Sequence, residues 1–448
     1  MYLHEYAYDV NTPVHPVSAP DYMPVEQLRA LQLHRLQGMV KRCYECVPLT
    51  RKRMDELGVR PDHIKTLADI KHLPFTVKTD LRDQYPLGLS ASPISEIARF
   101  HCSSGTTGKP IVIANTHNDI RIWQEAVMRC LAMGGVRSND VLQVAYGYGL
   151  FTGGLGLHYG GEGIGCAVLP TSAGNTERQL MLMHDLGVTS IACTPSYFLH
   201  MIGEAQRRGI DFQKDMKLKR GFFGAEPWTE AMRQKIEEMT GIRAYDIYGL
   251  TEISGPGVGG ECACRRGLHI FEDHFYPEIV DPNTLEPLPD GEVGELVFTT
   301  LTRTGTPMMR YRTRDLTFIH AEPCKCGRTV RTIQRIHARS DDMLIIHGVN
   351  VFPSQIETAL LSVNEVLPHY QIIITPTDTL DLLEIQVEVT AESFSDDIKS
   401  LEGLRKRVFQ AVHRVIGLSP KITLVEPNTL PRSEGKSHRV IDNRKKGL

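Results

Sequence analysis

The segment Phe100–Pro110 concentrates residue types that bind phosphate. Its sequence, FHCSSGTTGKP, supplies serine and threonine hydroxyls, glycines and a lysine, and such loops direct backbone N–H groups and hydroxyls at phosphate oxygens. It is not a Walker A loop, because only two residues separate Gly105 from Gly108 and because Pro110 follows Lys109 where that motif needs a magnesium-binding hydroxyl. The segment therefore predicts a phosphate site whose magnesium ligand lies elsewhere in the chain.

Charged residues later in the chain are candidate partners for that site. Glu252 follows Thr251 in YDIYGLTEISGPG, Asp315 stands among arginines in MRYRTRDLT, and Lys436 lies in the polar segment PRSEGK. A carboxylate on a turn is a suitable magnesium ligand. Taken singly, each of these residues is more often a solvated charge or a surface ion pair. Their chemistry therefore depends on the fold bringing them together.

A second group of residues has the ligand types of a structural zinc site. Cys262 and Cys264 precede His269 in ECACRRGLH, and Cys324 and Cys326 follow in EPCKCGRT. Three sulfurs and one imidazole close a tetrahedral zinc site, and either Cys262 or Cys264 completes the set. Buried free thiols are the alternative, as for the other cysteines, most of which stand singly in apolar surroundings.

The bulk composition limits the class of protein. The chain has 448 residues, which predicts about two to three domains. Its 50 basic and 53 acidic side chains nearly cancel, so no overall field favours nucleic acid or an anionic membrane. We find no signal peptide at the N-terminus and no run near the roughly 18 apolar residues of a membrane span. We expect a cytoplasmic protein that acts on small molecules; a homodimer is compatible with the sequence.

The elements that must position these residues form an α/β pattern. A helix is predicted over residues 25–46 from its apolar spacing. Between about residues 100 and 340, short apolar runs such as IVIA, VLQVAY, CAVLP, SIACTP and LKRGFFGAEP alternate with helical patterns at residues 176–184 and 230–239. This alternation predicts parallel sheets covered by helices, with ligands at the carboxyl ends of the strands.

The last hundred residues form a different pattern. Two strands, YQIIITP and LLEIQVEVT, lie between predicted helices at residues 355–361 and 397–416, and a strand KITLVEP follows. The tail around Lys436 is predicted to be an exposed polar loop. We therefore expect a large multi-sheet N-terminal domain over residues 1–340 and a small, mobile α+β domain over residues 341–448.

The order of these motifs resembles the adenylate-forming acyl-CoA ligase superfamily, from about residue 25 to the end. The segments SSGTTGKP, AYGYGLFTGGLG, FFGAEPWTE, DIYGL, EDHFYPEIV, FTTLT, RSDDMLI, GVNVFPSQIE and PRSEGK are closest to its phenylacetate branch. The resemblance implies an N-terminal adenylation domain and a two-step reaction. A carboxylate attacks the α-phosphorus of ATP and releases pyrophosphate, and coenzyme A then displaces AMP to give a thioester.

The same resemblance implies roles for individual residues. Glu252 would bind Mg²⁺, Thr251 would contact the α-phosphate, and Lys436 would act on the reacting carboxylate. The β and γ phosphates would be held by Ser103, Ser104, Gly105, Thr106, Thr107, Gly108 and Lys109. Adenine would lie between Gly224, Ala225, Glu226 and Pro227 on one side and Asp246, Ile247, Tyr248 and Gly249 on the other. Asp315 would accept the ribose hydroxyls, with Arg335 or Arg339 beside it.

Other implied roles concern the acid, the thiol and the metal. The ring of an aryl acid, phenylacetate being the best match, would lie among Tyr146, Phe151, Ala225, Ile247 and Pro256. Asp341 would be the hinge between the domains, and Gly348 and Asn350 would line the thiol tunnel. Ala338 and His347 depart from a common Gly and Arg, which puts thiol affinity in question. Some members of the branch also carry the Cys/His set.

Two other functions fit the same motifs. One is an adenylyltransferase that stops after the first step, and the other is a non-catalytic ATP-binding relative. The intact segment HGVNVFPSQ argues against the first, and the presence of both Glu252 and Lys436 argues against the second.

Overall fold

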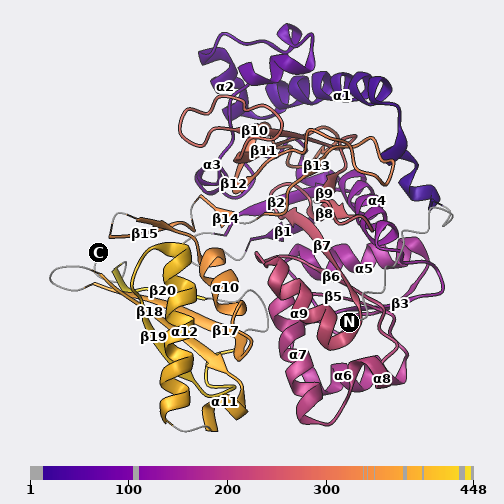
Figure 1. Cartoon of the computed structure of the whole chain (residues 1–448). Coiled ribbons are helices and arrows are strands. Elements are labelled where there is room, and N and C mark those ends of the chain that lie inside the picture. Colours follow the sequence, from indigo (N-terminus) through magenta and orange to yellow (C-terminus); the bar gives the residue numbers. More distant parts are fainter. Residues whose placement is uncertain are drawn as a thin grey trace.

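The computed structural model describes residues 14–103, 110–336, 338–340, 342–347, 349–376, 381–395, 398–432 and 439–444. Figure 1 shows a large body that contains the N-terminal residues and a smaller body, orange to yellow, that is built from the C-terminal residues. We call the described residues up to 340 the larger unit and those from 342 on the C-terminal unit. No helix among the described residues is both long and apolar enough to cross a membrane.

An eight-stranded sheet forms the centre of the larger unit. Its spatial order is β13 (Thr332–Ile333), β9 (Leu268–Ile270), β8 (Gly255–Glu261), β7 (Arg243–Leu250), β6 (Arg220–Phe223), β5 (Ser190–Cys193), β3 (Val141–Val144) and β4 (Ala167–Leu169). The five strands from β4 to β7 are parallel, which confirms the pattern predicted from the sequence. The strands β7, β8, β9 and β13 are antiparallel; short connections join β7 to β8 and β8 to β9, whereas β13 returns to β9 after the strands β10, β11 and β12 between residues 275 and 317.

The helices that connect the parallel strands begin and end with ordinary capping residues. They are α5 (Thr152–Ile164), α6 (Thr176–Asp185), α7 (Pro195–Arg207), α8 (Phe212–Asp215) and α9 (Glu230–Thr240), and α4 (His117–Met133) leads from β2 (Val112–Thr116) into β3. In α9, the Thr229 hydroxyl accepts from the Met232 N–H at 3.2 Å, and Gly241 ends the helix in a left-handed conformation. Met232 and Ile236 lie one turn apart and are buried, so α9 presents its other faces outward.

A second sheet of the larger unit is antiparallel, contrary to the parallel sheets that the sequence predicts. It contains β10 (Phe275–Val280), β11 (Gly294–Thr300), β12 (Tyr311–Thr317) and β14 (Ala338–Arg339). The strand β12 alternates between buried and half-buried residues, which places Asp315 on its buried face. A hairpin of β1 (Ile97–Cys102) and β2 (Val112–Thr116) carries the phosphate loop between its strands.

The N-terminal region packs on this core as helices and short 3-10 turns. The predicted first helix is confirmed as α1 (Val25–Cys46). It is followed by α2 (Pro48–Glu56) and α3 (Lys78–Asp83), and 3-10 turns lie at Pro16–Tyr22, Pro61–His63, Leu67–His72 and Ile94–Glu96. Buried residues of α1 such as Leu36 and Val40 form one core cluster with Leu301 and Met309 of the second-sheet region.

The C-terminal unit has a hydrophobic core of its own, from Leu344 to Ile422. It contains the hairpin β15 (Leu344–Ile346) and β16 (Val349–Val351), the helices α10 (Pro353–Leu361), α11 (Ala391–Ser395) and α12 (Ile398–Ile416), and a sheet in the order β19 (Lys421–Val425), β18 (Leu382–Val389), β17 (Val366–Thr375) and β20 (Val440–Asp442). The predicted strands and helices of this unit are therefore present. The strand β20, which pairs parallel to β17, was not predicted.

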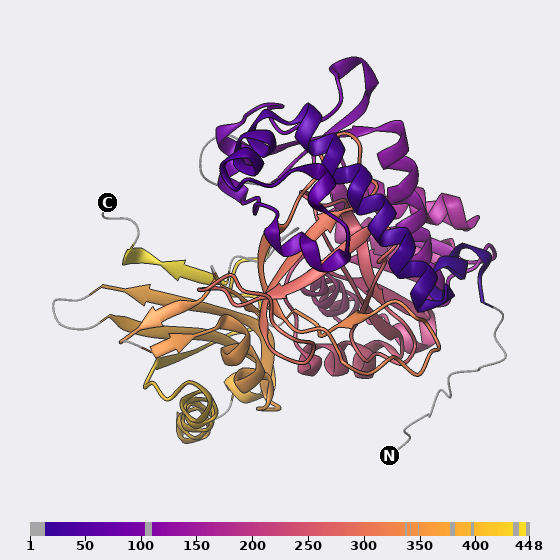
Figure 2. The ribbon, with the colours of Figure 1, turned by 90° about the horizontal axis from the view of Figure 1, so that it is seen from above.

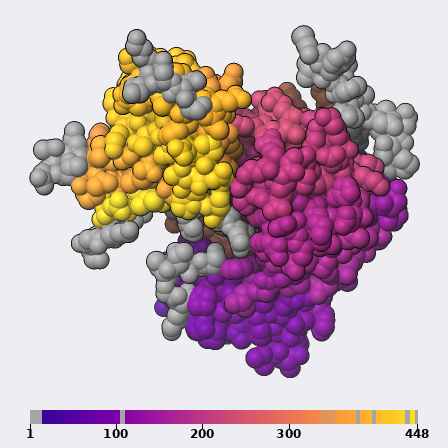
Figure 3. Space-filling model, turned by 90° about the horizontal axis from the view of Figure 1, so that it is seen from below, coloured from indigo at the N-terminus to yellow at the C-terminus, as the bar shows by residue number. Residues whose placement is uncertain are grey.

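The two units lie side by side. Figure 2 shows the sheet of the C-terminal unit pointing away from the larger unit, and Figure 3 shows the units in contact from below. The contact is made in part by α9 and α10. Leu361 at the end of α10 packs on a core cluster that includes residues of α7 and α9.

Candidate functional site

Asp315 is the centre of one polar group in the second sheet. The Tyr248 hydroxyl donates to Asp315 Oδ2 at 2.6 Å, and Arg339 Nη1 donates to Asp315 Oδ1 at 2.9 Å. Arg339 is the residue opposite Asp315 in the β12–β14 pair. Burial raises the pKa of Tyr248 well above its ordinary value, and the neighbouring Asp315 carboxylate adds to this. Each oxygen of the Asp315 carboxylate therefore accepts a hydrogen bond from a different side chain.

Arg335 contacts a different carboxylate, that of Asp246. The structure therefore decides between the two arginines that the sequence offered as neighbours of Asp315. Arg335 Nε donates to Asp246 Oδ2 at 3.0 Å, and its Nη2 donates to the Trp228 carbonyl at 3.0 Å. The guanidinium carbon lies 4.4 Å from the centre of the Trp228 ring. Arg339, rather than Arg335, therefore stands beside Asp315.

Glu252 lies in the turn after β7 and is 5% exposed. Lys78 Nζ at the start of α3 is 3.4 Å from Glu252 Oε1. Arg303 holds the backbone of this turn, because its Nη1 donates to the Glu252 carbonyl at 3.0 Å and its Nη2 donates to Asn115 Oδ1 at 2.7 Å. Burial lowers the pKa of Arg303 to about 10. Sequence reasoning missed Lys78, whose segment carries no recognised motif, and Arg303, which directly follows the segment FTTLT.

The segments on both sides of the predicted adenine site approach each other closely. A Cβ atom on Gly224 would lie 2.2 Å from the Ile247 carbonyl oxygen, and one on Gly249 would lie 1.8 Å from the Gly255 carbonyl oxygen. Neither position therefore accepts a side chain. Ala225 is exposed and has a φ of 68°, a left-handed conformation that is strained for a residue with a Cβ. Pro227 is exposed beside it, whereas Glu226 Oε1 accepts from the Ser196 N–H of α7 at 2.8 Å.

The predicted acyl pocket combines buried and exposed residues. Tyr146 and Ile247 are buried, whereas the Phe151 side chain, at the start of α5, is 48% exposed. The Pro256 carbonyl accepts from Trp123 Nε1 at 2.8 Å, which fixes the start of β8 against α4. Burial raises the pKa of Tyr146 well above its ordinary value. Thr251 Oγ1 lies 3.5 Å from Thr152 Oγ1 of α5.

Several predicted residues lie outside the described part of the chain. They are Ser104, Gly105, Thr106, Thr107, Gly108 and Lys109 of the phosphate loop, the hinge Asp341, the tunnel residue Gly348 and the catalytic Lys436. At the start of the loop, the Ser103 N–H donates to the Ile111 carbonyl at 3.2 Å. Asn350 is described only by its backbone in β16. His347, one of the two departures, has a φ of 50°, and its Nε2 lies 2.6 Å from the Asp381 carbonyl.

Cys262, His269, Cys324 and Cys326, which we call the metal cluster, come together as the sequence analysis proposed. One ligand atom from each of the four buried residues lies within 4.8 Å of the other three. The Sγ atoms of Cys262 and Cys324 are 3.7 Å apart, and Cys326 Sγ is 3.3 Å from His269 Nε2. His269 Nδ1 lies 3.3 Å from the Val330 carbonyl, which directs Nε2 at the sulfurs. Cys264 is half-buried and lies outside this set.

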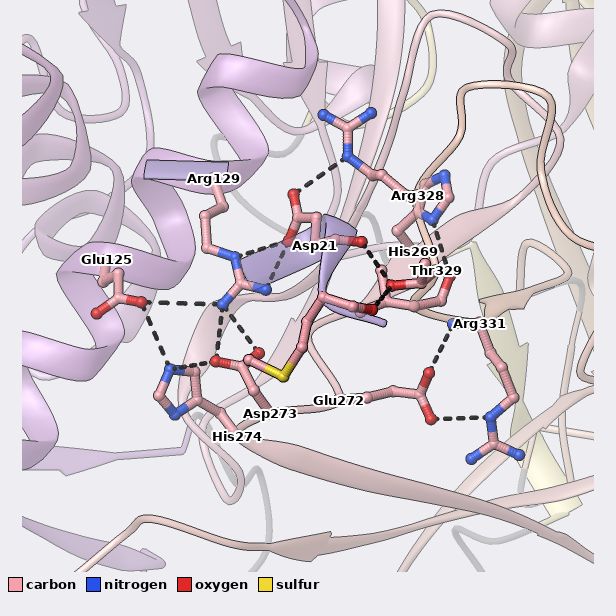
Figure 4. Close-up of polar contacts among 12 residues, drawn as sticks. Asp21, Glu125, Arg129, His269, Glu272, Asp273, His274, Arg328, Thr329 and Arg331 are labelled. Atoms are coloured by element: carbon pink, nitrogen blue, oxygen red, sulfur yellow. Dashed lines mark hydrogen bonds and ion pairs between the residues drawn. The ribbon is translucent and has the colours of Figure 1, made fainter. Parts of the chain in front are cut away.

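Next to the metal cluster lies a buried ion network of Asp21, Glu125, Arg129, Asp273 and His274 (Figure 4). Arg129 donates to Asp21 Oδ1 at 2.5 Å and to Asp273 Oδ1 at 2.9 Å, and its side chain is fully buried. Burial alone would raise the pKa of Asp273, but Arg129 and His274 outweigh it and hold that pKa below its ordinary value. Arg328, two residues after Cys326, donates to Asp21 Oδ2 at 3.1 Å. The network therefore joins the N-terminal 3-10 turn, α4 and the metal cluster.

Comparison with known proteins identifies the family of this chain. The AMP-binding enzyme family matches residues 30–304, and the AMP-binding enzyme C-terminal domain matches residues 348–444. The phenylacetate-coenzyme A ligase of Thermus thermophilus is 50% identical over 437 residues, which cover 94% of this chain and 98% of that protein. The phenylacetate-coenzyme A ligase of Escherichia coli is 46% identical over 435 residues, 97% of this chain and 98% of that protein.

Solved structures of one enzyme, 2-hydroxyisobutyryl-CoA ligase, match the fold over nearly the whole chain. Its postadenylation state in complex with 2-HIB-AMP has a TM-score of 0.91 at 30% identity and covers 98% of this chain and 95% of its own. Its thioesterification state in complex with 2-HIB-AMP and CoA has a TM-score of 0.70 at 30% identity and covers 97% and 94%. With these matches in sequence and in fold, the chain belongs to the AMP-binding enzyme family, in the group of the phenylacetate–coenzyme A ligases.

Proposed function

We propose that this protein joins phenylacetate to coenzyme A in an ATP-dependent, AMP-forming reaction. The observation that carries the proposal is the identity of 46–50% to four phenylacetate-coenzyme A ligases over at least 94% of this chain. Identity at this level extends through both units, so it includes the AMP-binding part and the C-terminal part.

In the first step a carboxylate oxygen bonds to the α-phosphorus of ATP while the bond to pyrophosphate breaks. Two anions meet, so donors and cations must stabilise the charge that develops. We propose that Asp315 binds the two ribose hydroxyls. Its two oxygens would then accept hydrogen bonds from the nucleotide in place of those from Tyr248 and Arg339. Thr251 would donate to the α-phosphate, and the phosphate loop from Ser103 to Lys109 would hold the departing phosphates.

Glu252 is the residue that we assign to Mg²⁺. Its carboxylate is buried and faces the ammonium group of Lys78, so a cation already occupies that side of the carboxylate. An oxygen ligand held in this way fits a hard cation, which supplies charge neutralisation to the phosphates when bound. Arg303 keeps the turn that contains Glu252 in place through its hydrogen bond to the Glu252 carbonyl.

In the second step the sulfur of coenzyme A bonds to the acyl carbon, AMP leaves and the thiol proton is released. Because Lys436 and the pantetheine arm would need the same space, we propose that the units rotate about Asp341, between domains of residues 1–340 and 341–448. Gly348 and Asn350 would then line the thiol path. The two arrangements of 2-hydroxyisobutyryl-CoA ligase support this alternation in a relative.

For the acid we propose an aryl group between Tyr146, Ile247 and Pro256, with Phe151 and Ala225 at the open side. Tyr146 and Ile247 are buried and Pro256 is held by Trp123, so this wall is fixed before the acid binds. A largely apolar wall discriminates weakly, by about 1–3 kcal/mol per methylene-sized group. We therefore expect phenylacetate to be preferred over its ring-substituted analogues by modest factors.

We propose that the metal cluster holds a structural Zn²⁺. A tetrahedral zinc with bonds of about 2.3 Å to sulfur separates two sulfurs by about 3.8 Å, and the sulfurs of Cys262 and Cys324 are 3.7 Å apart. Three thiols crowded around one imidazole also suit this cation better than any harder one. The site would pin the loop after β8 to the loop before β13 and keep both sides of the nucleotide site in register.

The experiment that tests the proposed function measures pyrophosphate release from ATP with phenylacetate and with a panel of aryl and aliphatic acids. Coenzyme A is present or absent in parallel. Phenylacetate is expected to give the highest kcat/KM, with AMP release stimulated by coenzyme A. Acid-dependent pyrophosphate release without thiol stimulation would favour an adenylyltransferase, and no ATP consumption with any acid would favour a non-catalytic protein.

A further inference from the structure

Lys235 of α9 reaches from the larger unit to the C-terminal unit. Its Nζ donates to the carbonyl oxygen of Val366, at the start of β17, at 3.0 Å. Val366 is buried and Lys235 is half-buried. Burial lowers the pKa of Lys235, and Glu238 partly opposes this effect. A charged donor removed from water makes a stronger hydrogen bond than an exposed one.

The contact lies beside apolar residues but is not free of charge, since Glu238 of α9 acts electrostatically on Lys235. Leu361 of α10 packs on the core cluster that contains residues of α7 and α9. His369, also on β17, lies near Lys235 and His200, and burial, with Arg432 and these two side chains, lowers the pKa of His369 to about 4. His369 is therefore neutral near pH 7 and adds no repulsion beside the ammonium group.

A carboxylate of the larger unit faces the same side of the C-terminal unit. Glu226, in the segment after β6, acts electrostatically on Arg439, the residue that precedes β20. Arg439 in turn donates to the Tyr370 hydroxyl of β17 at 3.1 Å. Arg439 also forms an ion pair with Glu357 of α10, so Glu226 adds a longer-range attraction to a charge that the C-terminal unit already pairs.

These contacts belong to one arrangement of the two units. The chain aligns over nearly its whole length with both states of 2-hydroxyisobutyryl-CoA ligase, yet the TM-score falls from 0.91 for the postadenylation state to 0.70 for the thioesterification state. The units of this chain are therefore arranged as in the postadenylation state. A rotation of the C-terminal unit moves β17 relative to α9 and separates Lys235 from Val366.

We propose that Lys235 is a positioning residue which, through the Val366 carbonyl, favours the arrangement in which the acyl-adenylate forms. Lys235 is assigned no contact with substrate. It acts by increasing the fraction of molecules that have this arrangement. The thioester step, which uses the other arrangement, gains nothing from the contact. This inference rests on the proposed function, because it assigns the two arrangements to the two steps.

The test separates the two steps in the full-length protein. Phenylacetate-dependent exchange of pyrophosphate with ATP reports adenylation, and a single turnover of synthetic phenylacetyl-adenylate with coenzyme A reports thioester formation. Lys235→Met keeps the aliphatic chain and removes the donor. It is expected to lower the exchange rate by about tenfold, the weight of one hydrogen bond from a charged donor, and to leave the single turnover within about twofold.

Two further variants complete the test. Gln234→Met changes the preceding, exposed position of α9 and is expected to leave both rates unchanged. Lys235→Arg restores a cationic donor and is expected to recover part of the exchange rate; if Lys235→Met does not fold, Lys235→Gln replaces it with the same expected split. Equal loss of both rates, or no loss in either, overturns the proposal. Failure of the wild-type protein in both assays overturns the proposed function instead.

Discussion

The buried ion network and the proposed nucleotide site, which we define as Tyr248, Glu252, Asp315 and Arg339, use the same side-chain chemistry with different exposure. In the network, Arg129 and Asp21 have no exposed side-chain surface; Arg129 binds Asp21, Asp273 and Glu125, and Asp21 also accepts from Arg328. At the nucleotide site each carboxylate is nearly buried, but its cation is not: the side chains of Lys78 and Arg339 are 43% and 30% exposed. One side of each pair therefore reaches solvent.

This difference separates a structural group from an exchangeable one. Arg129 cannot leave its carboxylates without stranding charges in a dry interior. Lys78 and Arg339 can swing into water at little cost and give up their carboxylates to a metal or a ribose. We therefore expect changes in the network to affect stability, and changes at the nucleotide site to affect catalysis.

The largest expected effect is in the network. Arg129→Met leaves Asp21 and Asp273 buried with too few partners and should reduce the free energy of unfolding by about 3–5 kcal/mol. Arg121→Met, at an exposed position of the same helix, should change it by less than about 0.5 kcal/mol. Urea unfolding measures both. An Arg129→Met protein as stable as the wild type would contradict the structural role that we assign to the buried ion network.

The next effect is at Asp315. Asp315→Asn keeps the shape but loses the charge that accepts two hydrogen bonds, so kcat/KM for ATP in pyrophosphate exchange should fall by roughly a hundredfold. The melting temperature should stay within about 3 °C of the wild type. Asp290→Asn, a change at an exposed acidic residue, serves as the control. If Asp315→Asn strongly lowers the melting temperature and leaves kcat/KM unchanged, Asp315 has a structural role like that of the buried ion network.

A smaller loss of stability is expected at the metal cluster. Cys324→Ser should abolish zinc binding and reduce the free energy of unfolding by at least about 2 kcal/mol, because a metal held only by the folded chain stabilises it. Elemental analysis should find one zinc per chain in the wild type and in Cys264→Ser. Zinc retained in Cys324→Ser but lost in Cys264→Ser would mean that Cys264, and not Cys324, is the zinc ligand.

The smallest effect is expected at Lys78. Lys78→Met removes the cation that competes with Mg²⁺ for Glu252, so half-saturation of pyrophosphate exchange by Mg²⁺ should occur at up to about fivefold lower concentration. Lys71→Met, at an exposed lysine in the preceding 3-10 turn, should leave it unchanged. A higher Mg²⁺ requirement in Lys78→Met would mean that Lys78 assists the metal instead of competing with it.

The sequence predicted the elements whose signals are local. The strands β5 and β6 are apolar runs, and α9 has a threonine cap, helical apolar spacing and a final glycine. The direction of a strand is set largely by its connection to the next strand, which a short apolar run does not reveal. The second sheet was therefore predicted with the wrong direction. The strand β20 was missed because it has only three residues and depends on its pairing with β17.

For the site, the rarity of a residue type decided what could be predicted. Cysteines and a histidine in close spacing have few explanations, so the metal cluster could be proposed before its members were seen together. Arginines and acidic residues are common and pair in many ways. Arg129 and Asp273 lie 144 positions apart, and only the packing of α4 against the second-sheet region brings them into contact. The choice between Arg335 and Arg339 depended equally on the path of the backbone.

The most direct test of the account measures the products of one reaction. Wild-type protein is incubated with phenylacetate, ATP, Mg²⁺ and coenzyme A, and AMP, pyrophosphate and phenylacetyl-CoA are quantified by chromatography and mass spectrometry. The account predicts that the three products form in equal amounts and that all three require the acid. Release of ADP and phosphate, or formation of AMP without any thioester, would contradict it.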